Sequence, residues 1–177
     1  GLLLLPGAII NAFMSPVTGK LFDRFGAKPL FIIGLIFIIP SMWVVTDLTE
    51  STTFIFLMVR TIFLRIGLSF ITMPLNTAGL NALPKILVTH GTAVNNTVRQ
   101  IAGAIGTAVV VTVFTAQTTK HAETLLEETP NATAEAVRSL ASIFGSSDAY
   151  YFMTILAIIA FVLTLFIPSK AKMKQSS

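Results

Sequence analysis

The amino-acid sequence predicts an all-α integral membrane protein with five transmembrane helices. Of its 177 residues, 54% are hydrophobic and only 11% are charged, whereas about a quarter of the residues in a soluble domain are charged. Long apolar runs alternate with shorter polar segments. The lysines and arginines gather mainly at the ends of these runs, which is where lipid headgroups lie.

Composition also narrows the classes of function. The formal net charge is +4, but the cations do not follow one polar face, so we expect a lipid bilayer and no nucleic acid as partner. The chain has no cysteine, and its two histidines fall far apart in predicted loops. We therefore expect no disulfide and no metal site. We likewise expect no cofactor and no enzymatic activity.

The first predicted span covers residues 1–17. The chain opens on Gly1 with no basic segment and no small-residue cleavage site, so this run is not a signal peptide. We interpret the chain as a fragment, because the run is shorter than the roughly 20 residues that a spanning helix needs. Pro6 and Pro16 interrupt the span, and Pro16 also marks the exit into the next turn.

A polar turn at residues 19–28 connects the first two spans and predicts a tight hairpin. Gly19 and Gly26 allow a positive φ or a close backbone approach at the two ends of the turn. Three cations of the turn lie at one lipid surface: Lys20, Arg24 and Lys28. By the positive-inside rule this surface is cytoplasmic.

The second span covers residues 29–45. It opens on Pro29, which suits a first helical turn, and Trp43 lies near its far end, at the depth of an aromatic belt. The following loop, residues 46–53, holds two acids and no cation. We therefore place this loop outside the cell.

The third span covers residues 54–74 and continues into a polar cytoplasmic segment, residues 75–92, which is predicted to end at Gly91. The fourth span covers residues 93–116. Its first two turns are unusually polar, with the residues Asn95, Asn96, Thr97, Arg99 and Gln100.

An acidic stretch, residues 117–148, is predicted to be a long outward loop. Hydrophobic residues recur at helical spacing in its second half, which predicts a surface amphipathic helix. These residues are Val137, Leu140, Ala141 and Phe144. The last span covers residues 149–167, and the tail, residues 168–177, returns to the cytoplasm.

The distribution of cations supports this threading. Seven cations fall on the predicted inner side, namely Lys20, Arg24, Lys28, Lys85, Lys170, Lys172 and Lys174. Only two, Lys120 and Arg138, fall outside. Because lysines and arginines collect on the cytoplasmic side, the imbalance favours five spans with the tail inside.

Two stretches of the sequence resemble one transporter family. Residues 79–84 read Gly-Leu-Asn-Ala-Leu-Pro, and residues 90–108 begin His-Gly-Thr-Ala-Val-Asn-Asn-Thr-Val-Arg-Gln. Both are similar to the fourteen-span drug:proton antiporters, the EmrB/QacA-like branch of the major facilitator superfamily. The pattern Gly-x-x-x-Asp-Arg-x-Gly-x-Lys at residues 19–28 resembles the loop signature of that superfamily.

The resemblance implies a place and a function. The chain would be the carboxy-terminal five of fourteen spans in a major facilitator superfamily helical bundle of a bacterial plasma membrane, and a missing amino-terminal half would supply the rest. The whole protein would export drugs or other amphipathic small molecules in exchange for protons, by alternating access. Two alternatives stay open: a single-antibiotic or lipid exporter of the same fold, and a non-transporting five-span membrane assembly subunit.

Charged residues within the spans are candidates for function. Proton coupling needs a titratable group buried in the membrane, but every Asp and Glu falls in a predicted loop, so we expect no coupling by this chain alone. Arg65, near the bilayer centre, needs a partner. That partner is a carboxylate of the missing half or substrate, or else a structural ion pair or water-filled site. Arg60 is shallower and can extend its charge outward, and we favour a structural role for it.

The loop signature supplies a candidate conformational latch, formed by Gly19, Asp23, Arg24, Gly26 and Lys28. Asp23 is expected to accept hydrogen bonds from the start of a neighbouring helix, with Arg99 as a candidate partner. The alternative is a solvated turn charge. The polar start of the fourth span either lines the inner mouth of the pathway or joins helices. Its candidate residues are Asn95, Asn96 and Gln100, with Asn76 and Asn81 from the preceding segment.

Small residues share one face of the fourth span. They are Ala102, Gly103 and Gly106, at positions i, i+1 and i+4 of the helix. Small side chains let a second helix approach closely within a membrane. We therefore interpret this face as a helix-packing surface rather than as a nucleotide-binding loop.

Overall fold

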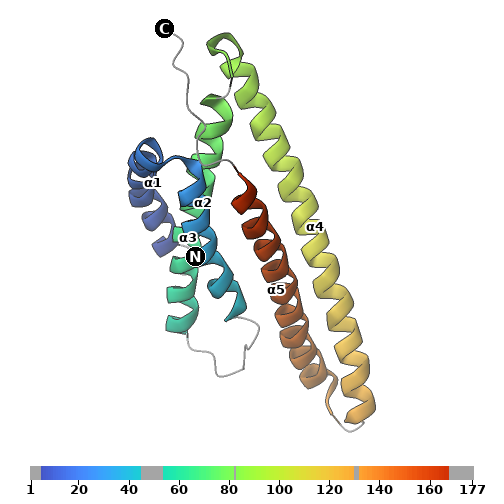
Figure 1. Cartoon of the computed structure of the whole chain (residues 1–177). Helices are drawn as coiled ribbons and strands as arrows, with labels where there is room; N and C mark the ends of the chain where they lie inside the picture. Colours follow the sequence, from blue (N-terminus) through green and yellow to red (C-terminus); the bar gives the residue numbers. More distant parts are fainter. Residues whose placement is uncertain (1–4, 45–53, 82, 130–131, 168–177) are drawn as a thin grey trace.

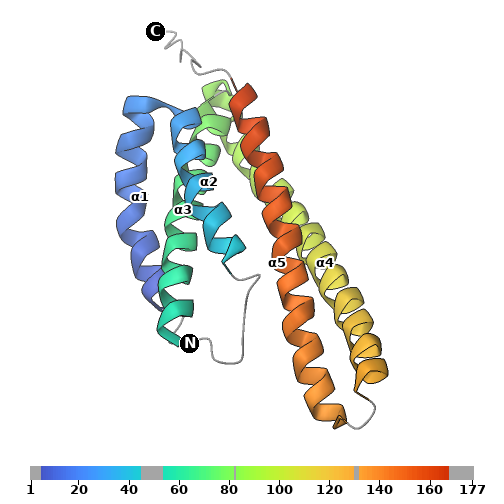
Figure 2. The same cartoon turned by 60° about the horizontal axis from the view of Figure 1, so that its bottom comes forward.

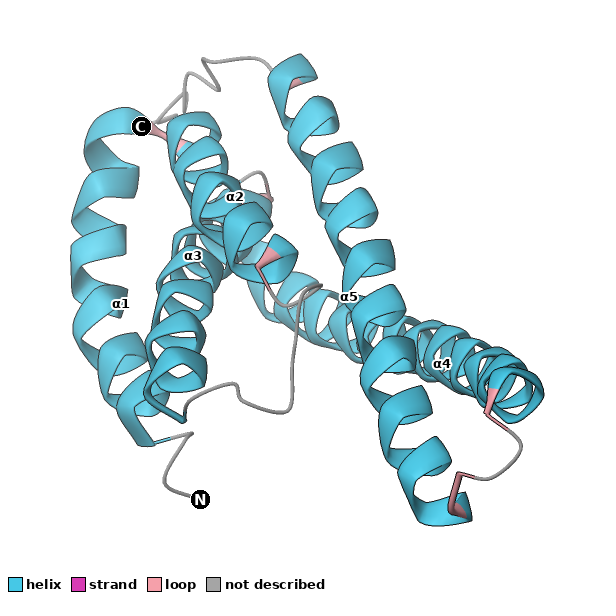
Figure 3. Cartoon of the chain, turned by 90° about the horizontal axis from the view of Figure 1, so that it is seen from below, coloured by secondary structure: helices cyan, strands magenta, loops and turns pink. Residues whose placement is uncertain are grey.

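A computed structural model describes residues 5–44, 54–81, 83–129 and 132–167 of the chain. These residues form five α-helices, namely α1 (Leu5–Phe25), α2 (Ala27–Trp43), α3 (Phe54–Asn81), α4 (Val88–Glu128) and α5 (Ala134–Phe166). A short 3-10 helix, η1 (Lys85–Leu87), precedes α4. Within these ranges there is no strand, which confirms the predicted all-α class (Figure 3).

The helices run up and down one bundle. α1, α2 and α3 pack together, α5 packs against α2, and α4 packs mainly against α5. The α1–α2 turn, the start of α4 and the end of α5 lie at one end of the molecule (Figures 1 and 2). The α4–α5 connection lies at the other end. Each described α-helix thus runs in the direction opposite to the one before it, and the threading of the chain through a membrane stays a prediction.

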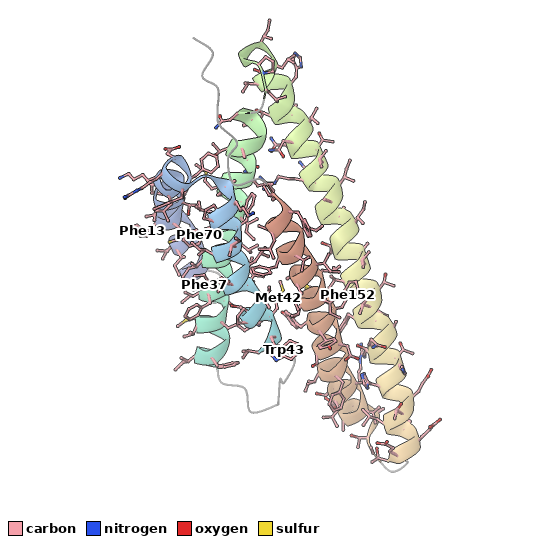
Figure 4. All side chains as sticks on the ribbon, viewed as in Figure 1. Phe13, Phe37, Met42, Trp43, Phe70 and Phe152 are labelled. Atoms are coloured by element: carbon pink, nitrogen blue, oxygen red, sulfur yellow. The ribbon has the colours of Figure 1, made fainter. Side chains whose placement is uncertain are left out.

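The first three helices share a buried core. Phe22 of α1, Leu30 of α2 and Phe70 of α3 form one hydrophobic cluster. Two glycines bring α2 and α3 together, because a Cβ at Gly34 would lie 2.8 Å from the Gly67 carbonyl oxygen, and a Cβ at Gly67 would lie 2.7 Å from that of Gly34. Only glycine fits both positions, as is common where membrane helices cross closely. By contrast, Phe13 projects from the outer face of α1 (Figure 4).

The α4–α5 hairpin is longer than the other helices. α4 has 41 residues and α5 has 33, which at about 1.5 Å per residue gives roughly 60 Å and 50 Å. A bilayer core is only about 30 Å thick. The hairpin extends past the lower ends of α2 and α3 in Figure 1. Its far part therefore reaches beyond the depth that the shorter helices share.

Length and composition support a multi-pass membrane protein. Three helices are long and apolar enough to cross a bilayer: Met58–Asn81 within α3, and the whole of α4 and α5. α2 is also apolar but has only 17 residues. The search covers the described residues only, so the five-span arrangement remains a prediction.

The segment predicted as an outward loop is mostly helical. α4 continues to Glu128 and α5 begins at Ala134, so the predicted amphipathic helix and the last predicted span form one helix. Val137 and Ala141 are buried in it, whereas Leu140 and Phe144 are exposed. Acidic residues were read as loop, but a helix that leaves the lipid accommodates charges on its solvent face.

Other predicted loop positions also lie in helices. Gly91 is inside α4 instead of ending a helix, Gly19 is inside α1, and both histidines belong to α4. The described acids are all helical: Asp23, Glu123, Glu127, Glu128, Glu135 and Asp148. The premise that every acid lies in a loop is therefore wrong for this part of the chain.

Candidate functional site

Polar side chains of α3 and α4 meet where the chain passes from one helix to the other. Asn95 Nδ2 donates to Asn76 Oδ1 over 3.1 Å, and Arg99 Nη1 donates to the same oxygen over 3.3 Å. Asn95 and Arg99 lie four residues apart, so they share one face of α4. We call Asn76, Asn95 and Arg99 the amide cluster. It joins α3 to α4 by hydrogen bonds rather than by buried apolar surface.

An open hollow lies beside the amide cluster. Asn96, Arg99 and Gln100 line it, and its volume is about 270 Å³. Ligand pockets usually enclose about 300–1,000 Å³ and cover most of a ligand, so this open hollow is at most one wall of such a site. Four residues predicted from the sequence, Asn95 with these three, thus come together at one place.

Arg65 lies in the middle of α3 and is half-buried. Its backbone oxygen accepts a hydrogen bond from Ser69 Oγ at 3.0 Å. Among the described residues, its guanidinium has neither an ion pair nor a hydrogen bond. A charge at this depth is costly unless it is paired. The partner that the sequence analysis requires is therefore not supplied by the described helices.

Arg60 has well-defined contacts with two other helices. Its Nε donates to the Ser41 carbonyl oxygen of α2 over 2.5 Å. Its Cζ lies 4.7 Å from the centre of the Tyr150 ring of α5. The last four carbonyls of a helix have no partner within the helix, so a cation at the end of α2 satisfies one of them. Arg60 thus connects α2, α3 and α5 instead of extending to the outer surface.

Aromatic side chains of α2 and α5 meet near Arg60. Trp43 ends α2, and its ring lies 5.8 Å from that of Tyr151 on α5. Figure 4 shows Trp43 at the lower end of α2, on the side of α5. Tyr150 and Tyr151 therefore mark the same level of the bundle as the end of α2.

The α1–α2 turn is tighter than predicted. Helix α1 continues to Phe25, Gly26 alone separates the helices with a φ of 80°, and α2 begins at Ala27. Left-handed backbone of this kind favours glycine, which confirms the prediction for Gly26. Gly19 is different, because it is helical and a Cβ there would lie at an ordinary 3.6 Å from Met73 Cε.

The charges of the loop signature have separate partners. Lys28 Nζ donates to the Leu165 carbonyl oxygen over 2.8 Å, so this cation caps the last turn of α5. Arg24 Cζ lies 5.2 Å from the centre of the Phe25 ring. Asp23 is exposed and pairs with no described residue. The expected contact between Asp23 and Arg99 is not formed, because Arg99 binds Asn76.

The small-residue face of α4 is open in this chain. A Cβ at Gly103 or at Gly106 would meet no atom within 4 Å, and Ala102 is exposed. No described residue of α4 is buried. The close helix approach predicted for this face is therefore not made by the other described helices.

One polar contact was missed by the sequence analysis. His121 Nε2 of α4 lies 2.9 Å from Asp148 Oδ2 of α5. The signal that would have revealed it is helical continuity, because the two residues face each other only if residues 117–148 form a hairpin. With those residues read as a loop, neither side chain had a defined direction.

Comparison with known proteins identifies the family. The family model of the Major Facilitator Superfamily matches residues 1–107, more than half of the chain. The chain belongs to the Major Facilitator Superfamily. Members are multi-pass membrane transporters, which agrees with the three membrane-compatible helices and confirms the membrane localisation.

Bacterial members of the superfamily are similar over most of the chain. The lincomycin resistance protein LmrB of Listeria monocytogenes is 40% identical over 97% of this chain and 35% of its own length. The uncharacterized MFS-type transporter YhcA of Bacillus subtilis is 46% identical over 75% of this chain and 25% of its own length. The multidrug efflux pump LfrA of Mycolicibacterium smegmatis is 24% identical over 79% of this chain and 28% of its own length.

The chain spans about a quarter to a third of the length of these relatives. No solved structure matches it. The rest of each relative has no counterpart in this chain.

Proposed function

We propose that the chain is the carboxy-terminal part of a fourteen-span drug exporter of the EmrB/QacA-like branch. The observation that carries this proposal is the similarity to a lincomycin resistance protein over 97% of the chain and 35% of that relative. Five of fourteen spans are a little over a third, which is the share expected for the last five. The name of a second relative, a multidrug efflux pump, points to the same class of substrate.

The whole protein would export amphipathic compounds by alternating access, as secondary transporters do. The amide cluster and the hollow at Asn96, Arg99 and Gln100 would form part of the inner mouth of the pathway. The amide groups of Asn76, Asn95, Asn96 and Gln100 suit this position, because they offer hydrogen bonds to varied substrates without the desolvation cost of a buried charge. The one charged group, Arg99, is exposed. The alternative role, holding α3 against α4, uses the same contacts.

The proton-carrying carboxylate would come from the missing amino-terminal half. Within the described helices, every acid except Asp148 is exposed, whereas coupling needs a carboxylate that the protein shields from water. Arg65 would pair with such a carboxylate or with substrate. The guanidinium of Arg65 is half-buried and has no partner in the part of the chain that the structure describes, which supports this role.

The test is drug efflux by the protein expressed from its complete gene in a drug-sensitive bacterium. We expect efflux of several unrelated amphipathic compounds, dissipated when the proton gradient is collapsed. Arg65→Ala should lower efflux per folded protein about tenfold or more, because it leaves the carboxylate or substrate that Arg65 would pair with uncompensated within the membrane. Arg138→Ala, at an exposed site of α5, is the matched control and should be silent.

Each alternative has its own outcome in this test. Export of one antibiotic or of lipid alone would replace the multidrug proposal by a specific exporter of the same fold. A complete gene that encodes only these five helices, with no efflux, would favour the assembly subunit. Unchanged efflux and expression in Arg65→Ala would remove Arg65 from the pathway.

A further inference from the structure

The far half of the α4–α5 hairpin contains an ionisable pair that the transport proposal does not use. His121 Nε2 and Asp148 Oδ2 are 2.9 Å apart, and their side chains are 34% and 37% exposed. The Phe144 ring of α5 lies 5.4 Å from the His121 ring, at an interplanar angle of 43°. The imidazole is thus held between a carboxylate and an aromatic ring.

Backbone packing fixes the separation of the two helices at this point. A Cβ at Gly145 would lie 2.1 Å from Thr118 Oγ1 and 2.9 Å from the Thr118 backbone nitrogen. α4 and α5 are therefore in direct contact one turn away from both members of the pair. Helical side chains lean toward the amino-terminus of their helix. In antiparallel helices, His121 and Asp148 consequently lean toward each other across the Thr118–Gly145 contact.

A third polar group lies at the same contact. Thr118 Oγ1 is buried and has no hydrogen-bond partner among the described residues. Neighbouring threonines of α4 behave differently, since Thr119 and Thr124 each donate to the carbonyl four residues earlier. Buried hydroxyls are rarely left unpaired. The contact between α4 and α5 therefore includes a buried polar atom one turn away from His121.

Few other charges act on the pair. Along α4 it is flanked by Lys120 and Glu123, both exposed. Along α5 the next ionisable groups are Tyr150, which contacts Arg60 of α3, and Tyr151, which contacts Trp43. The single charged residue of α2, Lys28, caps the other end of α5. Among the described residues, His121 and Asp148 are the only two of these groups that form an ion pair with each other.

We propose that His121 and Asp148 form a proton-binding site that ties the far half of the α4–α5 hairpin together. A carboxylate only accepts hydrogen bonds, so the hydrogen between the two groups lies on His121 Nε2. The proton taken up from solvent then binds to Nδ1 and leaves a charged imidazole against the carboxylate. Proton uptake strengthens the attraction between α4 and α5, and proton release weakens it. On the predicted threading of the proposed function, this end of the hairpin lies outside the cell, and only that placement of the site rests on the proposed function.

The test measures the separation of the two helices directly. The chain has no cysteine of its own, so spin labels on Thr124→Cys and Ser139→Cys, both exposed, report on the hairpin between the pair and its tip. The complete protein is used, with any cysteine outside this chain replaced. Histidine ordinarily titrates near pH 6.5, so distances are compared at about pH 5.5 and about pH 8. We expect the ratio of close to wide separations to be about two- to fivefold higher at the lower pH, the size of effect that a partly exposed ion pair produces.

Two variants and one control decide the assignment. Asp148→Asn should abolish the pH response, and His121→Lys should abolish it while keeping the ion pair, because a lysine stays charged to about pH 10. His90→Asn, at the other, exposed histidine of α4, should leave the response intact. If Asp148→Asn does not fold, His121→Lys decides alone.

The proposal would be overturned if the distribution of distances between the two spin labels in the wild type were the same at both pH values. A pH response that persists in His121→Lys would also overturn it. Transport does not enter this measurement. A protein that shows the pH response but exports nothing would contradict the proposed function and leave the proton site standing.

Discussion

The two sides of the helix bundle are held together in different ways. On one side, α1, α2 and α3 share a buried cluster, and the backbones of α2 and α3 meet at Gly34 and Gly67. On the other side, α4 contributes no buried residue among those described, and it reaches α3 through the amide cluster. On the first side, the helices already pack closely against one another. On the second side, most of the surface of α4 is not covered by the other described helices.

This difference indicates which surface of the described helices is available for contacts with lipid or with further helices. A helix that is apolar all round faces lipid or further protein. The middle of α4, residues 101–116, combines such a surface with a small-residue face, where a Cβ at Gly103 or Gly106 would meet no atom within 4 Å. The α1–α3 side has little comparable space near its glycine contact. Further helices of a complete transporter would therefore pack on α4 rather than between α2 and α3.

The largest expected effect comes from a large residue at the close contact between α2 and α3. Gly67→Leu inserts four carbons where even a Cβ would lie 2.7 Å from a backbone oxygen. Overpacking by a methylene or two already costs about 1–3 kcal/mol, so we expect the loss to exceed about 3 kcal/mol and to leave almost no folded protein. Folded yield is measured by fluorescence-detected gel filtration after extraction from membranes.

The control for this substitution lies on the same helix. Gly79→Leu places the same side chain on α3 where a Cβ meets no atom within 4 Å. Its yield should stay close to that of the wild type. Equal yields for the two variants would contradict the close α2–α3 contact.

A leucine on the open face of α4 tests the other half of the comparison. A Cβ at Gly103 meets no atom of the described chain within 4 Å, so we expect a harmful effect only if a helix that is not among those described packs on this face. We expect a loss of up to about 3 kcal/mol in the complete protein, measured as a several-fold lower folded yield, with the drug preference of the surviving protein unchanged. A normal yield would show that lipid, not protein, covers this face.

The sequence predicted the α1–α3 side better than the hairpin. Three residues with strong local preferences mark the ends of α1 and α2. Gly26 favours a turn, Pro29 favours a first helical turn, and Trp43 favours a membrane surface. Residues 117–148 lack such signals. Their acids are compatible with a loop and equally with a helix outside the lipid, and only packing against a partner helix decides between them.

The candidate site was predicted in part for the same reason. Asn95, Asn96, Arg99 and Gln100 were recognised because polar residues are rare in an apolar helix. The partner of Arg99 was not, since Asn76 lies 23 residues earlier and meets it only through the rotation of α3 against α4. Side-chain direction after a helix–helix turn depends on tertiary packing, which periodicity alone does not contain.

A smaller effect is expected at Arg60, which connects α2 and α3 to α5. Arg60→Ala removes a charged hydrogen bond to the Ser41 carbonyl and the contact with the Tyr150 ring. Hydrogen bonds to charged groups contribute about 1.5–3 kcal/mol and cation–π contacts about 0.5–2 kcal/mol, with partial compensation by water. We expect the free energy of unfolding to fall by about 2 kcal/mol, measured by thermal unfolding in detergent. Arg60→Lys should recover part of this loss, and equal stability of Arg60→Ala and the wild type would exclude a structural role.

The smallest expected effect is at Asp23, and its sign separates a latch from a solvated charge. Asp23 is exposed in the last turns of α1, where the helix dipole disfavours an anion by about 0.3–1 kcal/mol. If the charge is only solvated, Asp23→Asn should slightly stabilise the protein and leave the ratio of inward- to outward-open states unchanged. If an absent helix holds the carboxylate, the same change should shift that ratio about two- to fivefold toward the inward-open state, since the loop then no longer holds the inward side closed. Fluorescence or cross-linking of the complete protein distinguishes the two outcomes, with Lys20→Gln, an exposed charge of the same turn region, as the matched control.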